Sequence, residues 1–248
     1  MHNPFDSIDH RLWPLPSSPW VMTQTWLDLL FMHWAIPVEQ MRKAVPSALP
    51  LDTYDGQAWI AVVPFRMSGV RPRMIPSVPR LSAFPELNVR TYVTLDNKPG
   101  VYFFSLEAGN PLAVQIARTW FHLPYFHAEM SLKDTGEIRY QSHRIHGNAP
   151  PADFRGTYRP TGDVYRSTPG SLEHWLTERY CLYTTDAHQN VYRAEIHHVP
   201  WPLQPATAEI EVNSMTEPHG LSLPDVPPLL HFARRLKVAV WPLKRISP

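Results

Sequence analysis

The stretch from Phe84 to Val93 alternates polar and apolar side chains and constrains the fold more than any other part of the chain. Successive residues of a strand point to opposite faces, so the alternation predicts an extended strand with two unlike faces. One face would carry Glu86, Asn88, Arg90 and Tyr92, and the other Leu87, Val89 and Val93. Polar side chains that face a core in this number usually have a partner or a function.

A second group of ionisable side chains lies among aromatic residues between positions 117 and 130. A helix is expected just before it, because Asn110 can cap a helix, Pro111 suits a first turn and Pro124 ends the pattern. Arg118 would lie on that helix. The other candidates are His122, Tyr125 and His127.

Most of the remaining chain reads as strands separated by rigid turns, since 28 prolines lie scattered between apolar segments while glycine numbers only 10. The sequence predicts an α+β class: a largely antiparallel sheet curled into a barrel, with about three short helices. Helices are expected at 38–45, after Asn110 and at 171–180. Strands are expected at 21–36, 51–65 (a hairpin turning at Asp55-Gly56), 87–95, 101–107, 126–132, 137–145, 154–158, 180–184, 191–198 and 229–246.

Two segments do not fit this pattern simply. Residues 206–215 suit a short strand or a short helix, and the pattern does not decide between them. Residues 69–83 look like a long loop of the kind that often has a function. Residues 1–20 are expected to form an extended arm that packs on a single domain made of residues 21–248.

Composition excludes several classes of function. A formal net charge of +1 gives no bulk field for nucleic acid or an anionic membrane. The single cysteine, Cys181, excludes an internal disulfide framework and suits a reducing compartment. No run of apolar residues is long enough for a membrane span and no signal peptide is recognisable, so a soluble, cytoplasmic protein is expected. Nucleotide-binding glycine loops and the GxSxG motif are absent, and no cofactor is expected.

Several short motifs resemble the YqjF-like family of uncharacterised bacterial proteins, and the likeness runs from about Trp26 to Trp241. Each motif is weak alone and specific in combination. The motifs are His33-Trp34, Gly56-Gln57-Ala58-Trp59, Phe84 to Tyr92, Gly100-Val101-Tyr102-Phe103, Leu123-Pro124-Tyr125, Glu178-Arg179-Tyr180 and His198-Val199-Pro200-Trp201.

That family is in turn similar to the acetoacetate decarboxylase-like fold, whose members enclose a pocket in a barrel-shaped sheet. Phe84-Pro85-Glu86 resembles the aromatic-x-Glu strand of the decarboxylases, and Arg118, six residues before Pro124, resembles their arginine. The lysine pair of those enzymes falls on Tyr125 and Phe126, which cannot condense with a carbonyl. The resemblance therefore implies the pocket without Schiff-base chemistry.

Three functional interpretations remain open. In the first, the protein is an enzyme with lyase-like acid–base chemistry on a small, anionic carboxylate or carbonyl metabolite. Glu86 would transfer the proton, Arg118 and Arg90 would hold the anion, and Tyr125 would polarise the carbonyl. The other expected ligand contacts are Asn88, Tyr92, His122 and His127.

In the second interpretation the same residues bind a ligand without turnover. In the third, the protein is structural and its pocket is filled by Tyr125, Phe126 and Trp120. Glu86 and Arg90 could also form a purely structural ion pair. The spacing of His122 and His127 is not that of a metal site, so no metal is expected. Numerous aromatic segments that are expected to be exposed suggest a homodimer.

Overall fold

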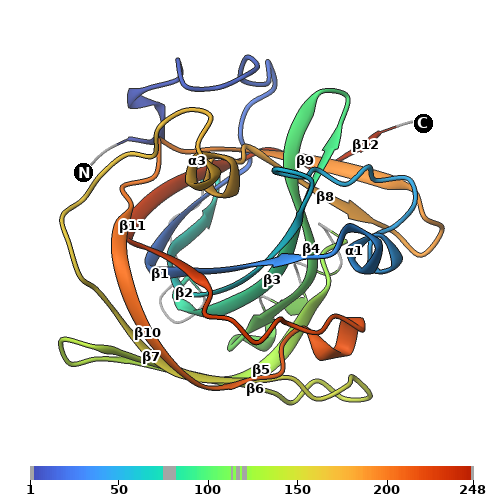
Figure 1. The fold of residues 1–248 in the computed structure, drawn as a ribbon. Coiled ribbons are helices and arrows are strands. Elements are labelled where there is room, and N and C mark those ends of the chain that lie inside the picture. The colour runs from blue at the N-terminus through green and yellow to red at the C-terminus, as the bar shows by residue number, and fades with distance from the viewer. Residues whose placement is uncertain (1–2, 75–81, 113, 116–117, 119–121, 247–248) are drawn as a thin grey trace.

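The structure is a computed structural model that describes residues 3–74, 82–112, 114–115, 118 and 122–246 (Figure 1). Its strands are β1 (Met22–Ile36), β2 (Ala58–Pro72), β3 (Phe84–Leu95), β4 (Lys98–Ala108), β5 (Tyr125–Asp134), β6 (Ile138–Arg144), β7 (Asp153–Pro160), β8 (Cys181–Thr185), β9 (Val191–His197), β10 (Gln204–Asn213), β11 (Leu229–Val240) and β12 (Lys244–Ile246). Its helices are α1 (Val38–Ala44) and α3 (Leu172–Thr177), with 3-10 turns η1 (Pro4–Asp6) and η2 (Glu217–His219).

The described strands form one sheet that closes on itself twice. Their order is β12-β9-β8-β4-β3-β2-β1-β11-β10-β7-β6-β5, and β9 also pairs with β11 while β4 also pairs with β5. The first extra pairing closes β9, β8, β4, β3, β2, β1 and β11 into a seven-strand ring. The second closes β4, β3, β2, β1, β11, β10, β7, β6 and β5 into a nine-strand ring. Strands β1, β2, β3, β4 and β11 form a wall that both rings share.

The shared wall crosses the middle of the molecule, with β8 and β9 on one side and β5, β6, β7 and β10 on the other (Figure 1). Both of its faces are therefore buried. Leu87 and Val89 of β3 pack into a core with Tyr140 and Phe154 of the nine-strand ring. The opposite face of β3 points into the seven-strand ring. This is the apolar face and the polar face that the alternation in β3 predicted.

Two irregularities shift the pairing register within this wall. Asp28 has a φ of 53° at a shift in the pairing of β1 with β2, so the residues facing the seven-strand ring change from Trp26 to Leu29. A similar shift occurs in β4 where it pairs with Val89 and Arg90 of β3. Bulges of this kind re-aim side chains without breaking the sheet.

The structure agrees with the predicted barrel-like class, with most of the predicted strands and with two of the predicted helices. The structure makes residues 204–213 a strand, which decides the open choice at 206–215. The prediction of one final strand over 229–246 was wrong, because the strand is interrupted after Val240 and resumes at Lys244.

Two other expectations need correction or are only partly described. The turn at Asp55-Gly56 is present, with both residues at positive φ, but β2 pairs with β1 and β3 instead of with 51–54. Strand β2 runs to Pro72, so the expected loop 69–83 starts later, and its residues 75–81 lie outside the described residues. In the helix expected after Asn110, residues 113, 116–117 and 119–121 lie outside them too, while Arg118 is helical.

Residues 3–20 lie against β9 through buried polar contacts. The Arg11 guanidinium forms an ion pair with Glu195 of β9 at 3.0 Å, and the Trp13 indole donates to the same carboxylate at 2.7 Å. Lys98 at the start of β4 pairs with that carboxylate at 2.6 Å. The segment thereby connects to two strands of the seven-strand ring.

Gly100 of β4 lies where β4 and β8 run parallel, and a side chain has no room there. A Cβ at this position would lie 2.7 Å from the Cys181 carbonyl oxygen and 2.6 Å from its sulfur. We expect Gly100→Ala to lower the free energy of unfolding by about 1–3 kcal/mol, since a backbone atom cannot move away cheaply. Urea unfolding measures it. Gly147→Ala is the control, because a Cβ there meets no atom within 4 Å. Equal stability of the two variants would contradict this packing.

Candidate functional site

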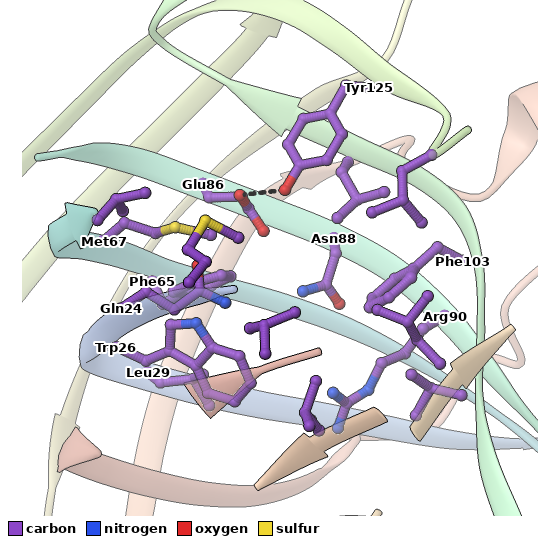
Figure 2. Close-up of a pocket in the computed structure, with 18 of the residues that line it drawn as sticks. Gln24, Trp26, Leu29, Phe65, Met67, Glu86, Asn88, Arg90, Phe103 and Tyr125 are labelled. Carbon is purple, nitrogen blue, oxygen red and sulfur yellow. Dashed lines mark hydrogen bonds between the residues drawn. The ribbon is translucent and has the colours of Figure 1, made fainter. Parts of the chain in front are cut away.

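The seven-strand ring encloses a cavity of about 370 Å³. Its lining includes a line of three polar side chains from β3, in the order Glu86, Asn88 and Arg90 (Figure 2). Alternate residues of a strand share a face, so the backbone of β3 presents all three to the same space. Most other lining residues are apolar. The cavity is therefore an apolar space with one polar stripe.

Glu86 and Tyr125 form one end of this stripe. The Tyr125 hydroxyl donates a hydrogen bond to Glu86 Oε2 at 2.8 Å (Figure 2). Glu86 is 2% exposed, and this burial raises the pKa of its carboxyl to about 8; the hydrogen bond from Tyr125 opposes the rise and the nearby Glu107 adds to it. Burial also raises the pKa of Tyr125 well above its usual value. At neutral pH both groups therefore hold protons.

Arg90 and Arg179 form the cationic part of the lining. Arg90 lies over the Phe31 ring at 5.1 Å, and Arg179, which follows α3, lies over the Tyr92 ring at 4.9 Å. Arg179 Nη1 pairs with Asp52 at 2.5 Å, and its Nε donates to the Trp175 carbonyl oxygen at 2.6 Å. Both side chains are less than a tenth exposed. Two guanidiniums in a buried, mostly apolar cavity favour an anionic ligand.

Five buried polar atoms of the lining have no hydrogen-bond partner among the described residues. They are Trp26 Nε1, Trp201 Nε1, Arg90 Nε, Arg179 Nη2 and Asn88 Oδ1. Buried polar groups are nearly always paired, so a set of unpaired ones around one cavity points to a bound partner, a ligand or water. Four of the five are N–H donors, and they favour a ligand rich in acceptor oxygens.

His198 also lines the cavity, and its hydrogen bonding fixes which nitrogen carries the proton. Its Nδ1 lies 2.8 Å from the Val199 carbonyl oxygen, which can only accept, so Nδ1 is the protonated nitrogen. Burial lowers the pKa of His198 to about 3, which keeps the ring neutral. The ring therefore adds no charge to the site, and its Nε2 is an acceptor.

The structure brings together four of the residues expected from the sequence: Glu86, Asn88, Arg90 and Tyr125 all line the cavity. Glu86 and Arg90 do not pair with each other among the described ion pairs. Tyr92 does not line the cavity; it is fully buried behind it, with its hydroxyl 2.7 Å from His33 Nε2. Tyr92 instead supports Arg179 through its ring.

The other three expected residues lie outside the lining. The Arg118 side chain is exposed, and its Nη1 donates to the backbone oxygen of Tyr125 at 2.6 Å. It therefore contacts the strand that carries the tyrosine but does not contribute a charge to the cavity. His122 is exposed beside the Tyr192 ring, and His127 is half-buried, with its backbone N–H donating to His146.

Trp26, Arg179, His198 and Trp201 are among the lining residues that were not sequence candidates. The last three belong to the short motifs Glu178-Arg179-Tyr180 and His198-Val199-Pro200-Trp201, which carry much of the family resemblance. The concentration of polar residues in these motifs was the sequence signal that could have identified them as candidates. Nothing in their spacing showed that they face β3.

In the described part of the chain, no three His, Cys, Asp or Glu side chains lie close enough together to hold a metal ion. Among the helices described, none has the length and apolar character needed to cross a bilayer.

The raised pKa of Glu86 predicts a specific pH dependence of stability. Between pH about 4.5 and 8 the folded protein holds a proton on Glu86 that the unfolded chain loses, so this stabilising contribution is complete at low pH and falls as pH rises. The free energy of unfolding of the wild type, relative to Glu86→Gln, should fall by up to about 1.4 kcal/mol per pH unit across this window. Urea unfolding at several pH values measures it.

Tyr125→Phe provides the matching variant for this prediction. Loss of the hydroxyl removes the hydrogen bond that lowers the Glu86 pKa, so the fall in stability should extend to higher pH than in the wild type. Parallel curves for the wild type and Glu86→Gln would show that Glu86 is not protonated in the folded protein.

Comparison with solved structures identifies the fold. An acetoacetate decarboxylase from Legionella pneumophila matches with a TM-score of 0.60 and 11% identity, covering 100% of this chain and 96% of that one. An acetoacetate decarboxylase-like enzyme from Sphingomonas wittichii RW1 matches at 0.61 and 12%, covering 96% and 98%. The enduracididine biosynthesis enzyme MppR, complexed with the condensation product of pyruvate and imidazole 4-carboxaldehyde, matches at 0.63 and 8%, covering 93% and 90%. At these identities the likeness shows a shared acetoacetate decarboxylase-like fold.

Comparison of sequences identifies the family. The DUF2071 family, described as an uncharacterized conserved protein, matches residues 23–237. The uncharacterized protein YqjF of Bacillus subtilis (strain 168) is 50% identical over 234 residues, which cover 94% of this chain and 96% of YqjF. The chain therefore belongs to the DUF2071 family and is YqjF-like, with an acetoacetate decarboxylase-like fold.

Proposed function

We propose that the cavity of the seven-strand ring binds a small metabolite that carries a carboxylate and a carbonyl group. The supporting observation is the polar stripe in an apolar cavity, with Glu86 and Tyr125 at one end and unpaired guanidinium N–H groups at the other. Arg90 and Arg179 would hold the carboxylate. A volume of about 370 Å³ falls in the range of small-molecule sites.

The chemistry available at the Glu86 end is proton transfer. The hydroxyl of Tyr125 and the carboxyl of Glu86 lie 2.8 Å apart, so both can reach one oxygen of a ligand. A carboxyl with a pKa of about 8 is well suited to give and take a proton near neutral pH. Tyr125 would polarise the carbonyl and Glu86 would exchange the proton. This is lyase-like acid–base chemistry in which no bond forms to the protein.

Schiff-base chemistry is not part of the proposal. No lysine occurs among the described residues that line the cavity, and Tyr125 occupies the position that the resemblance gives to a lysine of the decarboxylases. Hydrogen bonds from residues such as Tyr125 would then activate the carbonyl. Tyr125 lines open space, and this supports binding over the interpretation in which its ring fills the pocket.

Binding without turnover is the second candidate function, and the lack of a lysine among the described lining residues favours it. The two candidate functions differ in the role of Glu86, which transfers a proton only in the enzyme. If the protein is a carrier, Glu86→Gln should bind the ligand about as well as the wild type and nothing is converted. In an enzyme the same variant binds the ligand, but conversion falls by a factor of about 10²–10⁴, the usual contribution of one acid–base group. Product analysis by NMR distinguishes these results.

The anion-binding role of Arg90 can be tested by thermal unfolding against a panel of carboxylates and their matched amides. A carboxylate present at 100 times its Kd stabilises the protein by about 2.7 kcal/mol, which corresponds to a rise in Tm of several degrees. Arg90→Met should remove most of this rise, because the carboxylate loses a charge-assisted partner. Arg118→Met is the matched control, since Arg118 lies outside the lining and its loss should leave the rise unchanged. Amides that stabilise as well as acids would contradict an anionic ligand.

A further inference from the structure

One side of the cavity is an aromatic wall that the proton-transfer scheme does not use. Trp26 of β1 stacks against Trp201, with ring centroids 5.7 Å apart and an interplanar angle of 18°. The Trp26 ring also packs on Phe65 of β2 at 6.0 Å. In Figure 2 Trp26, Phe65 and Leu29 lie together, while Glu86, Asn88 and Arg90 follow β3 past them. A ligand in the cavity thus lies between this wall and the polar stripe.

The aromatic wall and the cationic end of the stripe are close enough for one small molecule to contact both. The Phe31 ring packs edge-on against Trp201, with ring centroids 4.9 Å apart. The Arg90 guanidinium lies 5.1 Å from the centroid of the Phe31 ring. Arg90 and Trp201 therefore lie next to the same side chain. A single planar ring joined to a carboxylate by a short chain spans such a separation.

The aromatic wall indicates the chemistry of the part of the ligand that does not carry the carboxylate. Trp26 is half-buried and Trp201 is 2% exposed, yet neither indole N–H has a hydrogen-bond partner in the part of the chain that the structure describes. Flat aromatic surfaces favour stacking with another ring, and each free indole N–H favours an acceptor atom. A ligand of three or four carbons would leave this aromatic surface uncovered.

We infer that the ligand of this cavity is an aryl or heteroaryl carboxylate, with its ring on the wall formed by Trp26 and Trp201 and its carboxylate at Arg90 and Arg179. This inference rests on the proposed function and narrows its substrate class. It adds Trp26 and Trp201 as the residues that determine specificity for the body of the ligand. The short aliphatic keto acids are the competing class.

Isothermal titration calorimetry of the wild-type protein with four probes tests the inference. The probes are 3-phenylpropanoate, 3-(indol-3-yl)propanoate, 3-cyclohexylpropanoate and acetoacetate. We expect the two aryl acids to bind at least tenfold more tightly than acetoacetate, and more tightly than the cyclohexyl acid, whose ring has similar apolar bulk but cannot stack. This comparison needs no variant, so it stands whether or not a tryptophan can be replaced.

Trp26→Leu supplies a second test. It should weaken the aryl acids to the level of the cyclohexyl acid and leave acetoacetate binding unchanged, because acetoacetate does not reach the wall. Trp20→Leu is the matched control: Trp20 contacts Arg73 and is not part of the lining, so no Kd should change. Tryptophan fluorescence should respond to the aryl acids in the wild type and less so in Trp26→Leu.

The outcomes separate this inference from the proposed function. Acetoacetate binding as tightly as the aryl acids would overturn the aromatic substrate class and leave the carboxylate site intact. Loss of aryl binding in Arg90→Met confirms the shared carboxylate position. If 3-phenylpropanamide binds as well as 3-phenylpropanoate, the carboxylate site itself fails. Absence of binding by all four acids would overturn both.

Discussion

Both faces of β3 are buried, because the strand lies in a wall that two closed rings of the sheet share. One face packs Leu87 and Val89 into the core of the nine-strand ring. The other face has to place Glu86, Asn88 and Arg90 inside the smaller ring. Everything distinctive about the cavity follows from this arrangement, since removal of these groups from water decides their protonation and their need for partners.

The spacing of the stripe keeps its opposite charges from cancelling. Glu86 and Arg90 are four residues apart on one strand, which separates their backbones by about 13 Å at ~3.3 Å per residue. The acid therefore remains protonated beside Tyr125, while Arg90 joins Arg179 near the Tyr92 ring. The result is a slot with a neutral proton donor at one end and positive charge at the other. Asn88 lies between them.

The sequence predicted the parts of this site that depend on local pattern. Alternation placed Glu86, Asn88 and Arg90 on one face of a strand, and the resemblance added Tyr125. The sequence did not predict that Arg179 and Trp201 line the cavity, because their position opposite β3 follows from how the sheet closes. Arg118 was placed in the site by its distance from Pro124, but spacing does not show which way a helical side chain points. The bulge at Asp28 was also missed, and it decides that Leu29 follows Trp26 along the cavity.

A crystal structure of the protein with 3-phenylpropanoate would test the central claim most directly, because it locates the carboxylate relative to the two ends of the stripe. The account predicts the carboxylate oxygens within hydrogen-bonding distance of Arg90 and Arg179, and the phenyl ring in contact with Trp26 and Trp201. A carboxylate bound beside Arg118, on the outer surface, or with its ring away from both tryptophans would contradict it.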